Sequence, residues 1–323
     1  MTEHYVTLFD SVFLPQGLAL HHSLLKHGGE CVLWVLCLDD TSLKILQRLD
    51  LPQMRLLDLS QLETPELLAV KPGRTKAEYC WTLTPWSIQW VLEIDPAAQR
   101  VTYLDADLFF LNSPAPIFSE FEASGRAVMI TEHGYAPEYD QTPTVGRYCV
   151  QFLPIVRGLG EHVLHWWRDR CLEWCFARSE DGLFGDQRYV ESFEINFPGL
   201  IYSVGPDCRF QAPWNSSIFK FSDAILFHFH SLRIISDQLI CASSASYLLA
   251  PPAISYIYKP YCHLLFHLIS TFNLYVSAQA SVPSSLSLKK LRLTRKIRIK
   301  LNLPVAPPYW YQLYRDSDSG YLW

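Results

Sequence analysis

The chain has 323 residues, of which 49% are hydrophobic and 14% are aromatic. This length and composition suit one large α/β domain or two smaller ones, and they exclude an intrinsically disordered chain. The formal net charge is −5 and no DNA- or RNA-binding motif is evident, so we expect no nucleic-acid partner.

The cysteines and the N-terminus favour a cytoplasmic protein. Nine cysteines occur, an odd number, and none forms a Cys-x-x-Cys pair. Several lie inside apolar runs, as buried reduced thiols do. The residues from Met1 to His4 lead straight into a strand-like segment, without the charged and apolar leader of a signal peptide.

Strands and helices alternate in the first hundred residues. The predicted strands are Tyr5–Phe9, Val32–Leu38, Met54–Leu57 and Arg100–Leu104. The predicted helices run from Pro15 to a stop at Gly28-Gly29, from the N-cap Thr41 through Leu49, and from Pro85 to Glu93. Repeated βα units of this kind indicate a mainly parallel sheet that is covered on both faces.

The most informative motif is the Asp-x-Asp formed by Asp105 and Asp107. It follows a strand-like run, and carboxylates at the carboxyl end of a parallel strand lie where open α/β sheets bind ligands. Hard divalent cations prefer such carboxylates together with phosphate oxygens of a substrate. The motif therefore predicts a bridge between Mn²⁺ or Mg²⁺ and a diphosphate, although an Asp-x-Asp alone more often marks a solvated turn.

The middle of the chain is less regular. We expect strands at Ala127–Thr131, Tyr148–Val156 and Ala224–His230, and an amphipathic helix at Glu161–Phe176. Beyond about residue 236 the composition turns to Ser, Pro and aromatic residues without acids. We therefore expect one domain over residues 1–236, with a nucleotide-binding half (1–107) and an acceptor half (108–236), and a basic, helical or irregular extension over residues 237–323.

Several segments resemble GT-A-type nucleotide-sugar glycosyltransferases, in particular the families around glycogenin and the lipopolysaccharide galactosyl- and glucosyltransferases. The segments are FDSVFLPQGLALHHSL, RTKAEYCWTLTP, YLDADLFF with NSPAPIF, GDQ at 185–187, APWN at 212–215 and FHFHSL at 227–232. The resemblance runs from about Tyr5 to Arg233 and rests on the order of the motifs. It implies an α/β, Rossmann-like GT-A fold with a mixed, mainly parallel sheet flanked by helices.

The resemblance also implies an activity, that of a metal-dependent hexosyltransferase. Such an enzyme moves a sugar from a nucleotide-diphosphate sugar, here a UDP-sugar, to a glycan or glycolipid acceptor in polysaccharide biosynthesis. Asp105, Asp107 and His228 match the ligands of the Mn²⁺ or Mg²⁺ ion, which serves as Lewis acid and template. His230 is the alternative ligand, and we expect at most one of the two histidines to face the site because alternate strand residues point to opposite faces.

Further positions match substrate contacts of the family. Asp10 and Ser11 match contacts to uridine or ribose, while an ordinary Asx-turn explains them equally well. Asp186 and Gln187 resemble the catalytic pair beside the transferred sugar, although a surface turn explains them almost as well. Asn215 resembles a substrate-pocket residue.

The chain departs from the family pattern at its positive charges. Trp81 stands where many members carry an arginine before the Asp-x-Asp, and Arg74 and Lys76 nearby are candidates to replace its charge. The family's HxxGxxKPW signature is incomplete, because its glycine and lysine are missing. Arg233 is a candidate to contact the diphosphate instead, and retaining or inverting stereochemistry stays open.

Other functions share parts of this pattern. A nucleotidyltransferase that makes nucleotide sugars would have a similar acidic metal site, but Phe9 to Gly17 lacks the expected glycine-rich loop with a lysine. A phosphatase of the haloacid dehalogenase type expects Thr or Val where this chain has Phe109. A catalytically silent protein that binds nucleotide sugars or acts as a scaffold stays open.

Charge is unevenly distributed along the chain. No acid occurs between Asp237 and Asp316, and this interval carries +9, which leaves −14 on the remainder. The segment from Lys289 to Lys300 holds seven basic residues, each worth on the order of 1 kcal/mol near an anionic membrane. The segment thus predicts either peripheral contact with the inner face of a membrane or packing against the acidic body, and we weigh the two equally.

Overall fold

The computed structural model describes residues 2–237, 239–243, 247–276, 279 and 310–312. Its central sheet has the strand order β3-β2-β1-β4-β8-β6-β7, and β9 pairs with β6. The strands are β1 (Glu3–Phe9), β2 (Cys31–Cys37), β3 (Met54–Asp58), β4 (Arg100–Leu104), β6 (Val128–Glu132), β7 (Tyr148–Cys149), β8 (Phe152–Val156) and β9 (Ile201–Val204). β1 to β4 pair in parallel and β8 is antiparallel to both of its neighbours. The predicted mixed α/β sheet is confirmed.

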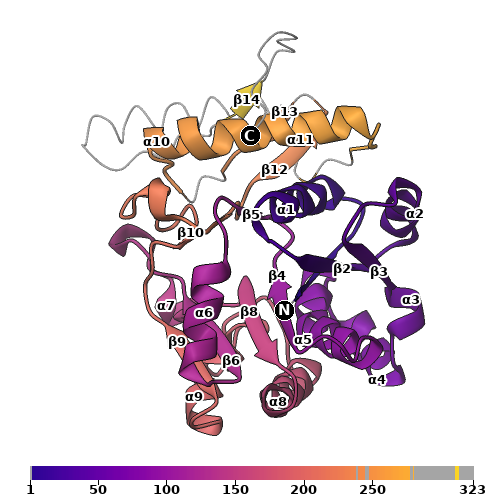
Figure 1. Cartoon of the computed structure of the whole chain (residues 1–323), viewed down its shortest axis with the longest axis vertical. Coiled ribbons are helices and arrows are strands. Elements are labelled where there is room, and N and C mark those ends of the chain that lie inside the picture. The colour runs from indigo at the N-terminus through magenta and orange to yellow at the C-terminus, as the bar shows by residue number, and fades with distance from the viewer. Residues whose placement is uncertain (1, 238, 244–246, 277–278, 280–309, 313–323) are drawn as a thin grey trace.

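Helices cover both faces of this sheet (Figure 1). They are α1 (Leu14–His27), α2 (Asp40–Leu49), α3 (Leu59–Leu62), α4 (Pro65–Val70), α5 (Lys76–Ile94), α6 (Ala115–Ser124), α7 (Thr142–Val145), α8 (Leu159–Glu173), α9 (Phe193–Asn196), α10 (Pro251–Ala253) and α11 (Lys259–Thr271). Successive strand residues point to opposite faces. Tyr5 therefore joins a core with α1, α6 and α11, whereas Val6 joins one with α5 and α8.

Two helix starts differ from the prediction. α5 begins at Lys76 rather than at Pro85, because Thr75 and Glu78 form a capping box and Pro85 is accommodated inside the helix. α2 has Asp39 rather than Thr41 as its N-cap, since the Asp39 carboxylate accepts the Ser42 backbone N–H at 2.8 Å.

Two small sheets complete the fold. One has the order β10 (Phe210–Gln211), β11 (Leu226–His228) and β5 (Leu108–Phe110), and the other contains β12 (Arg233–Ser236), β13 (Leu239–Cys241) and β14 (Trp310–Gln312). The segment Tyr148–Val156, predicted as one strand, is broken into β7 and β8 by two residues. The predicted strand Ala224–His230 is confined to β11.

The described part of the C-terminal extension packs on the domain. In Figure 1, α11 and the strands β12 and β13 form a layer above α1. Buried residues of α11 such as Tyr261 and Leu265 belong to the same hydrophobic core as Tyr5 and Phe109. Within the described residues, no helix is both long and apolar enough to cross a bilayer. The basic segment from Lys289 to Lys300 lies outside the described residues.

Candidate functional site

The site forms where the strand order of the central sheet reverses. β1 and β4 are neighbouring parallel strands, and they end at Phe9 and Leu104. Asp10 and Asp105 therefore follow at the same edge, which is where doubly wound sheets bind their ligands. A cavity of about 780 Å³ lies here, and residues from both predicted halves of the domain line it.

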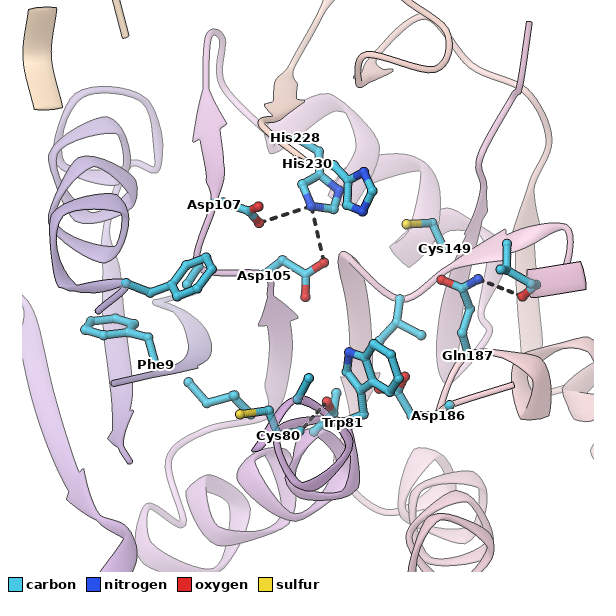
Figure 2. Close-up of a pocket in the computed structure, with 18 of the residues that line it drawn as sticks. Phe9, Cys80, Trp81, Asp105, Asp107, Cys149, Asp186, Gln187, His228 and His230 are labelled. Carbon is cyan, nitrogen blue, oxygen red and sulfur yellow. Dashed lines mark hydrogen bonds and ion pairs between the residues drawn. The ribbon is translucent and has the colours of Figure 1, made fainter. Parts of the chain in front are cut away.

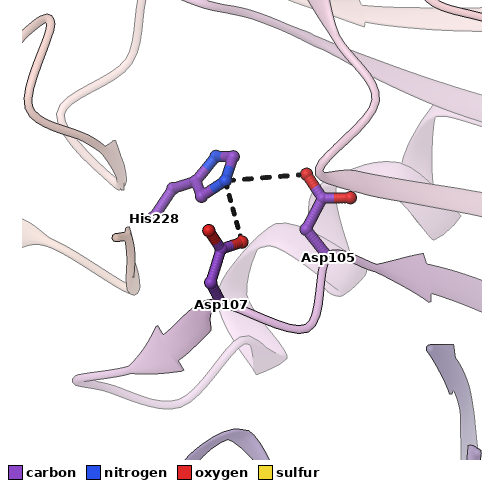
Figure 3. Close-up of side chains that lie close together, drawn as sticks. All are labelled: Asp105, Asp107 and His228. Atoms are coloured by element: carbon purple, nitrogen blue, oxygen red, sulfur yellow. Dashed lines mark ion pairs between the residues drawn. The ribbon is translucent and has the colours of Figure 1, made fainter. Parts of the chain in front are cut away.

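The backbone of the small sheet brings the two aspartates to His228. β11 runs antiparallel to β5 with His228 opposite Leu108, and the Phe229 N–H donates to the Asp107 carbonyl at 2.9 Å. The Nε2 atom of His228 lies 3.0 Å from Asp107 Oδ1 and 3.7 Å from Asp105 Oδ2 (Figure 3). The potential ligand atoms of these three residues all lie within 4.8 Å of one another, so the predicted convergence is seen in the structure.

Gln151 forms hydrogen bonds with two residues of this cluster. Its Oε1 lies 2.7 Å from Nδ1 of His228, and its backbone carbonyl accepts the Asp105 N–H at 3.1 Å. An amide oxygen only accepts hydrogen bonds, so Nδ1 carries a hydrogen. In the imidazolium, Nε2 also carries a hydrogen and donates it to Asp107, and Nε2 would offer a lone pair to a metal ion once that proton is lost. Gln151 could not be predicted as a supporting residue, because it lies inside the segment Tyr148–Val156 that was predicted as one continuous strand.

The charges of Asp105, Asp107 and His228 shift one another's pKa values. Burial raises the pKa of Asp105, and the charge of His228 only partly offsets this. Burial also acts to raise the pKa of Asp107, but the charge and hydrogen bond of His228 outweigh it and lower that pKa to about 2. Burial disfavours the imidazolium of His228, yet Asp107 raises its pKa well above the usual range. The cluster thus favours a positive charge between the carboxylates.

The chemistry of these side chains fits Mn²⁺ or Mg²⁺. Two carboxylates supply hard oxygen ligands, and one imidazole supplies a nitrogen. Carboxylate oxygens suit both of these ions. The three residues would hold the ion while other coordination positions stay available to a substrate.

Asp186 and Gln187 line the cavity (Figure 2). The side chain of Asp186 is buried, and this burial raises its pKa to about 8 despite a hydrogen bond from Thr84 that lowers it. Burial therefore favours the protonated form of the Asp186 carboxyl. Gln187 is anchored because its Nε2 donates to the Val145 carbonyl at 2.7 Å.

Trp81 supplies an aromatic surface on the same side of the cavity. Its ring centroid lies 5.9 Å from that of Phe184. Gly185 packs against this ring with a φ of +52°, and a Cβ there would lie 3.1 Å from Trp81 Cε3. Glycine at position 185 thus allows the turn and the ring to approach each other.

The loop after β1 forms a second wall. Asp10 accepts hydrogen bonds from the backbone N–H groups of Val12 and Phe13 and forms an ion pair with Lys76. The Asx-turn considered as an alternative is therefore present, and Asp10 and Lys76 both line the cavity as well. Ser11 is not among the lining residues, because its N–H and hydroxyl donate to Asp39.

Two predicted substrate contacts lie away from the cavity. The Arg74 guanidinium donates to the Leu172 carbonyl at 2.6 Å and to the Thr82 hydroxyl. Asn215 is 1% exposed, its Oδ1 accepts the Ala212 N–H, and its Nδ2 donates to backbone carbonyls. Both side chains form hydrogen bonds with groups outside the cavity, and neither side chain lines it.

His230 and Arg233 complete the lining. The expectation that only one of His228 and His230 faces the site is wrong, since β11 ends at His228 and both rings line the cavity. Ser231, with φ of +70°, then turns the chain into β12. The Arg233 guanidinium lies 5.8 Å from the centroid of the Phe13 ring. Among the described residues, Lys76 and Arg233 are the lysine and arginine side chains that line the cavity.

Sequence comparisons identify two related proteins from Bacillus subtilis (strain 168). "Uncharacterized protein YfnF" is 32% identical over 255 residues, which are 73% of this chain and 84% of that protein. "Uncharacterized protein YfnD" is 30% identical over 257 residues, which are 73% of this chain and 80% of that protein. No family model matches the chain.

Solved glycosyltransferase structures are also similar to this chain. Mouse xyloside xylosyltransferase 1 shares 17% identity over 71% of this chain and 98% of that one, with a TM-score of 0.47. The galactosyltransferase LgtC, solved with donor and acceptor sugar analogs, shares 13% identity over 88% of this chain and 99% of that one, with a TM-score of 0.49. At this level of similarity, neither bears on the donor or acceptor of this chain.

Proposed function

The chain belongs to the protein family of YfnF and YfnD, and we propose that it is a metal-dependent glycosyltransferase. It transfers a hexose from a nucleoside-diphosphate sugar, a UDP-sugar, to a glycan or glycolipid acceptor. The observation that carries this proposal is the cluster of Asp105, Asp107 and His228 at the carboxyl edge of a parallel sheet, in a cavity of about 780 Å³.

The charges of the cavity suit a nucleoside diphosphate. A cation held by Asp105, Asp107 and His228 would act as a Lewis acid toward the diphosphate leaving group. Arg233 and Lys76 place two further positive charges on the lining. The side chain of Lys76 is 67% exposed, so it can leave Asp10 and reach a phosphate oxygen.

Asp186 and Gln187 would contact the transferred sugar. A protonated Asp186 would donate a hydrogen bond to a sugar oxygen in addition to the one that it accepts from Thr84. Gln187, held by Val145, offers its amide oxygen to a sugar hydroxyl. Trp81 and Trp214 line the same cavity and can pack against the apolar face of a sugar ring.

The acceptor side of the proposal includes the membrane. The basic segment from Lys289 to Lys300, which lies outside the described residues, would hold the protein at the inner face of a membrane where a glycolipid acceptor is located. This contact is an extension of the proposal and does not depend on the metal cluster.

A screen of nucleotide sugars tests the activity. We expect release of UDP from at least one UDP-sugar in the presence of Mn²⁺ and loss of this release in EDTA. Asp107→Asn should lower the rate by about 100-fold or more, as the loss of a charge-stabilising group does. Asp169→Asn serves as the control, because the Asp169 side chain is 51% exposed and pairs with Arg168 at the surface.

Turnover by Asp107→Asn at the wild-type rate would contradict the metal assignment. Binding of UDP-sugars without any turnover, in the presence of glycan acceptors, would instead favour the silent binding protein.

A further inference from the structure

Gln279 connects two walls of the cavity from a distant part of the chain. Its Nε2 donates to the Val12 carbonyl at 2.7 Å, and its Oε1 accepts the Ile234 backbone N–H at 2.8 Å. The backbone N–H of Gln279 also donates to the Ile234 carbonyl at 2.9 Å. The side chain thus lies between the loop after β1 and the start of β12.

A second glutamine completes this arrangement. Gln16 on α1 is fully buried, and its Nε2 donates to Gln279 Oε1 at 3.0 Å. In return, Gln279 Nε2 lies 3.2 Å from Gln16 Oε1. The Gln279 amide therefore uses its oxygen twice as acceptor and its nitrogen twice as donor, which is its full hydrogen-bonding capacity on the donor side. A carbonyl at Val12 and an N–H at Ile234 allow only one orientation of this amide.

Both partners of Gln279 adjoin residues that face the cavity. Val12 lines the cavity itself and shares its loop with Asp10, while Ile234 follows Arg233. The Arg233 guanidinium lies over the Phe13 ring, so a second contact joins the same two walls. Gln279 therefore spans from the wall with Asp10 to the wall with the cation Arg233.

We propose that Gln279 is a positioning residue of the donor site, which sets the spacing between the loop after β1 and Arg233 so that both can contact one nucleoside diphosphate. This inference rests on the proposed function. A diphosphate joins a nucleoside to a sugar over a fixed length, so the groups that bind the nucleoside and the phosphates must keep a fixed separation. The segment after α11 then contributes to the donor site although none of its described side chains lines the cavity.

Removing the bridge leaves polar backbone groups without partners. In Gln279→Ala, the Val12 carbonyl and the Ile234 N–H, which are partly buried, both lose a hydrogen bond. Gln279→Glu keeps the acceptor for Ile234 but cannot donate to Val12. Gln16→Ala removes the partner on α1 and leaves both wall contacts of Gln279 in place.

The test is the binding of UDP in the presence of MnCl₂ to the full chain and to these three variants, measured by titration calorimetry. We expect the dissociation constant to rise about tenfold in Gln279→Glu, which is the effect of one lost hydrogen bond of this kind, and at least as much in Gln279→Ala, which loses both. We expect less than a twofold change in Gln16→Ala. In turnover, the same two Gln279 variants should raise KM for the donor more than they lower kcat.

Equal UDP affinity in wild type and both Gln279 variants would overturn the inference. An equally large loss in Gln16→Ala would also overturn it, because the effect would then arise from the packing of α1. Gln279→Glu has nearly the size of the native side chain and decides the matter if Gln279→Ala does not fold. If the wild-type protein itself binds no UDP, the proposed function fails rather than this inference.

Discussion

At the scale of single residues, Asp186 has a defined pH signature. Burial raises its folded-state pKa to about 8, whereas an aspartate in the unfolded chain titrates near its usual value of about 3.9. Between these two values the folded state holds one proton more than the unfolded state. Stability from this group is therefore present below about pH 4 and is lost as the pH rises through about 8.

Replacing Asp186 by asparagine removes this dependence, because the amide resembles the protonated acid and does not ionise. We expect the stability of Asp186→Asn relative to wild type to increase by up to about 1.4 kcal/mol per pH unit between about pH 4 and about pH 8. Chemical denaturation in EDTA across this range measures it. A difference that stays constant with pH would show that Asp186 ionises normally.

The clustering of Asp105, Asp107 and His228 could be predicted from the sequence and the family resemblance, and the residues that support this cluster could not. Asp105 and Asp107 follow a strand-like run, whereas His228 was assigned by its match to the family pattern. Gln151 and Gln279 act through partners 77 and 267 residues away in the chain. A single amide carries no periodic signal for such contacts.

At the scale of elements, the packing of α1 against β1 shapes the cavity. Gly17 lies in α1 against Phe9, and a Cβ at this position would overlap the Phe9 ring. Phe9 is 2% exposed and lines the cavity, so its ring has little room to move away from α1 without entering the site. Glycine is therefore used here for space within a helix, where alanine would otherwise be favoured.

Gly17→Ala separates packing from helix propensity. The higher helix propensity of alanine alone would stabilise the protein by about 0.5–1 kcal/mol. Overpacking of the new Cβ against the Phe9 ring costs about 1–3 kcal/mol. We expect net destabilisation, together with weaker UDP binding as Phe9 shifts into the cavity. Denaturant unfolding measures the first effect.

Gly73→Ala is the control for this prediction, since a Cβ at Gly73 would meet no heavy atom within 4 Å. If Gly17→Ala were more stable than wild type, the close packing of Phe9 on α1 would be refuted.

The elements themselves were largely predictable in the first hundred residues. Strands buried on both faces give continuous apolar runs, so β1, β2 and β4 were recognised within two residues. The start of α5 at Lys76 could not be predicted because Pro85 resembles a first helical residue, whereas the capping box of Thr75 and Glu78 starts the helix nine residues earlier. The break between β7 and β8 was missed because the apolar pattern continues across it.

At the scale of the whole molecule, the cavity is assembled from segments far apart in the chain. The loop after β1 and the Asp-x-Asp come from the first third, and Asp186, His228 and Arg233 come from later elements. The described part of the extension beyond residue 236 shares the hydrophobic core of α1, so it folds onto the domain. The change in composition predicted a domain boundary at residue 236, since composition carries no information about which elements pack together.

In the proposed function, Asp105, Asp107 and His228 hold a cation that binds the diphosphate of the donor. Calorimetric titration of UDP into the wild-type protein, with MnCl₂ and with EDTA, tests it most directly, with Asp107→Asn measured alongside. We expect binding to be about 100-fold tighter with Mn²⁺ than with EDTA, and this gain to vanish in Asp107→Asn. Equal UDP affinity in MnCl₂ and in EDTA, or a full gain from Mn²⁺ in Asp107→Asn, would show that these three residues do not hold a cation that binds the diphosphate.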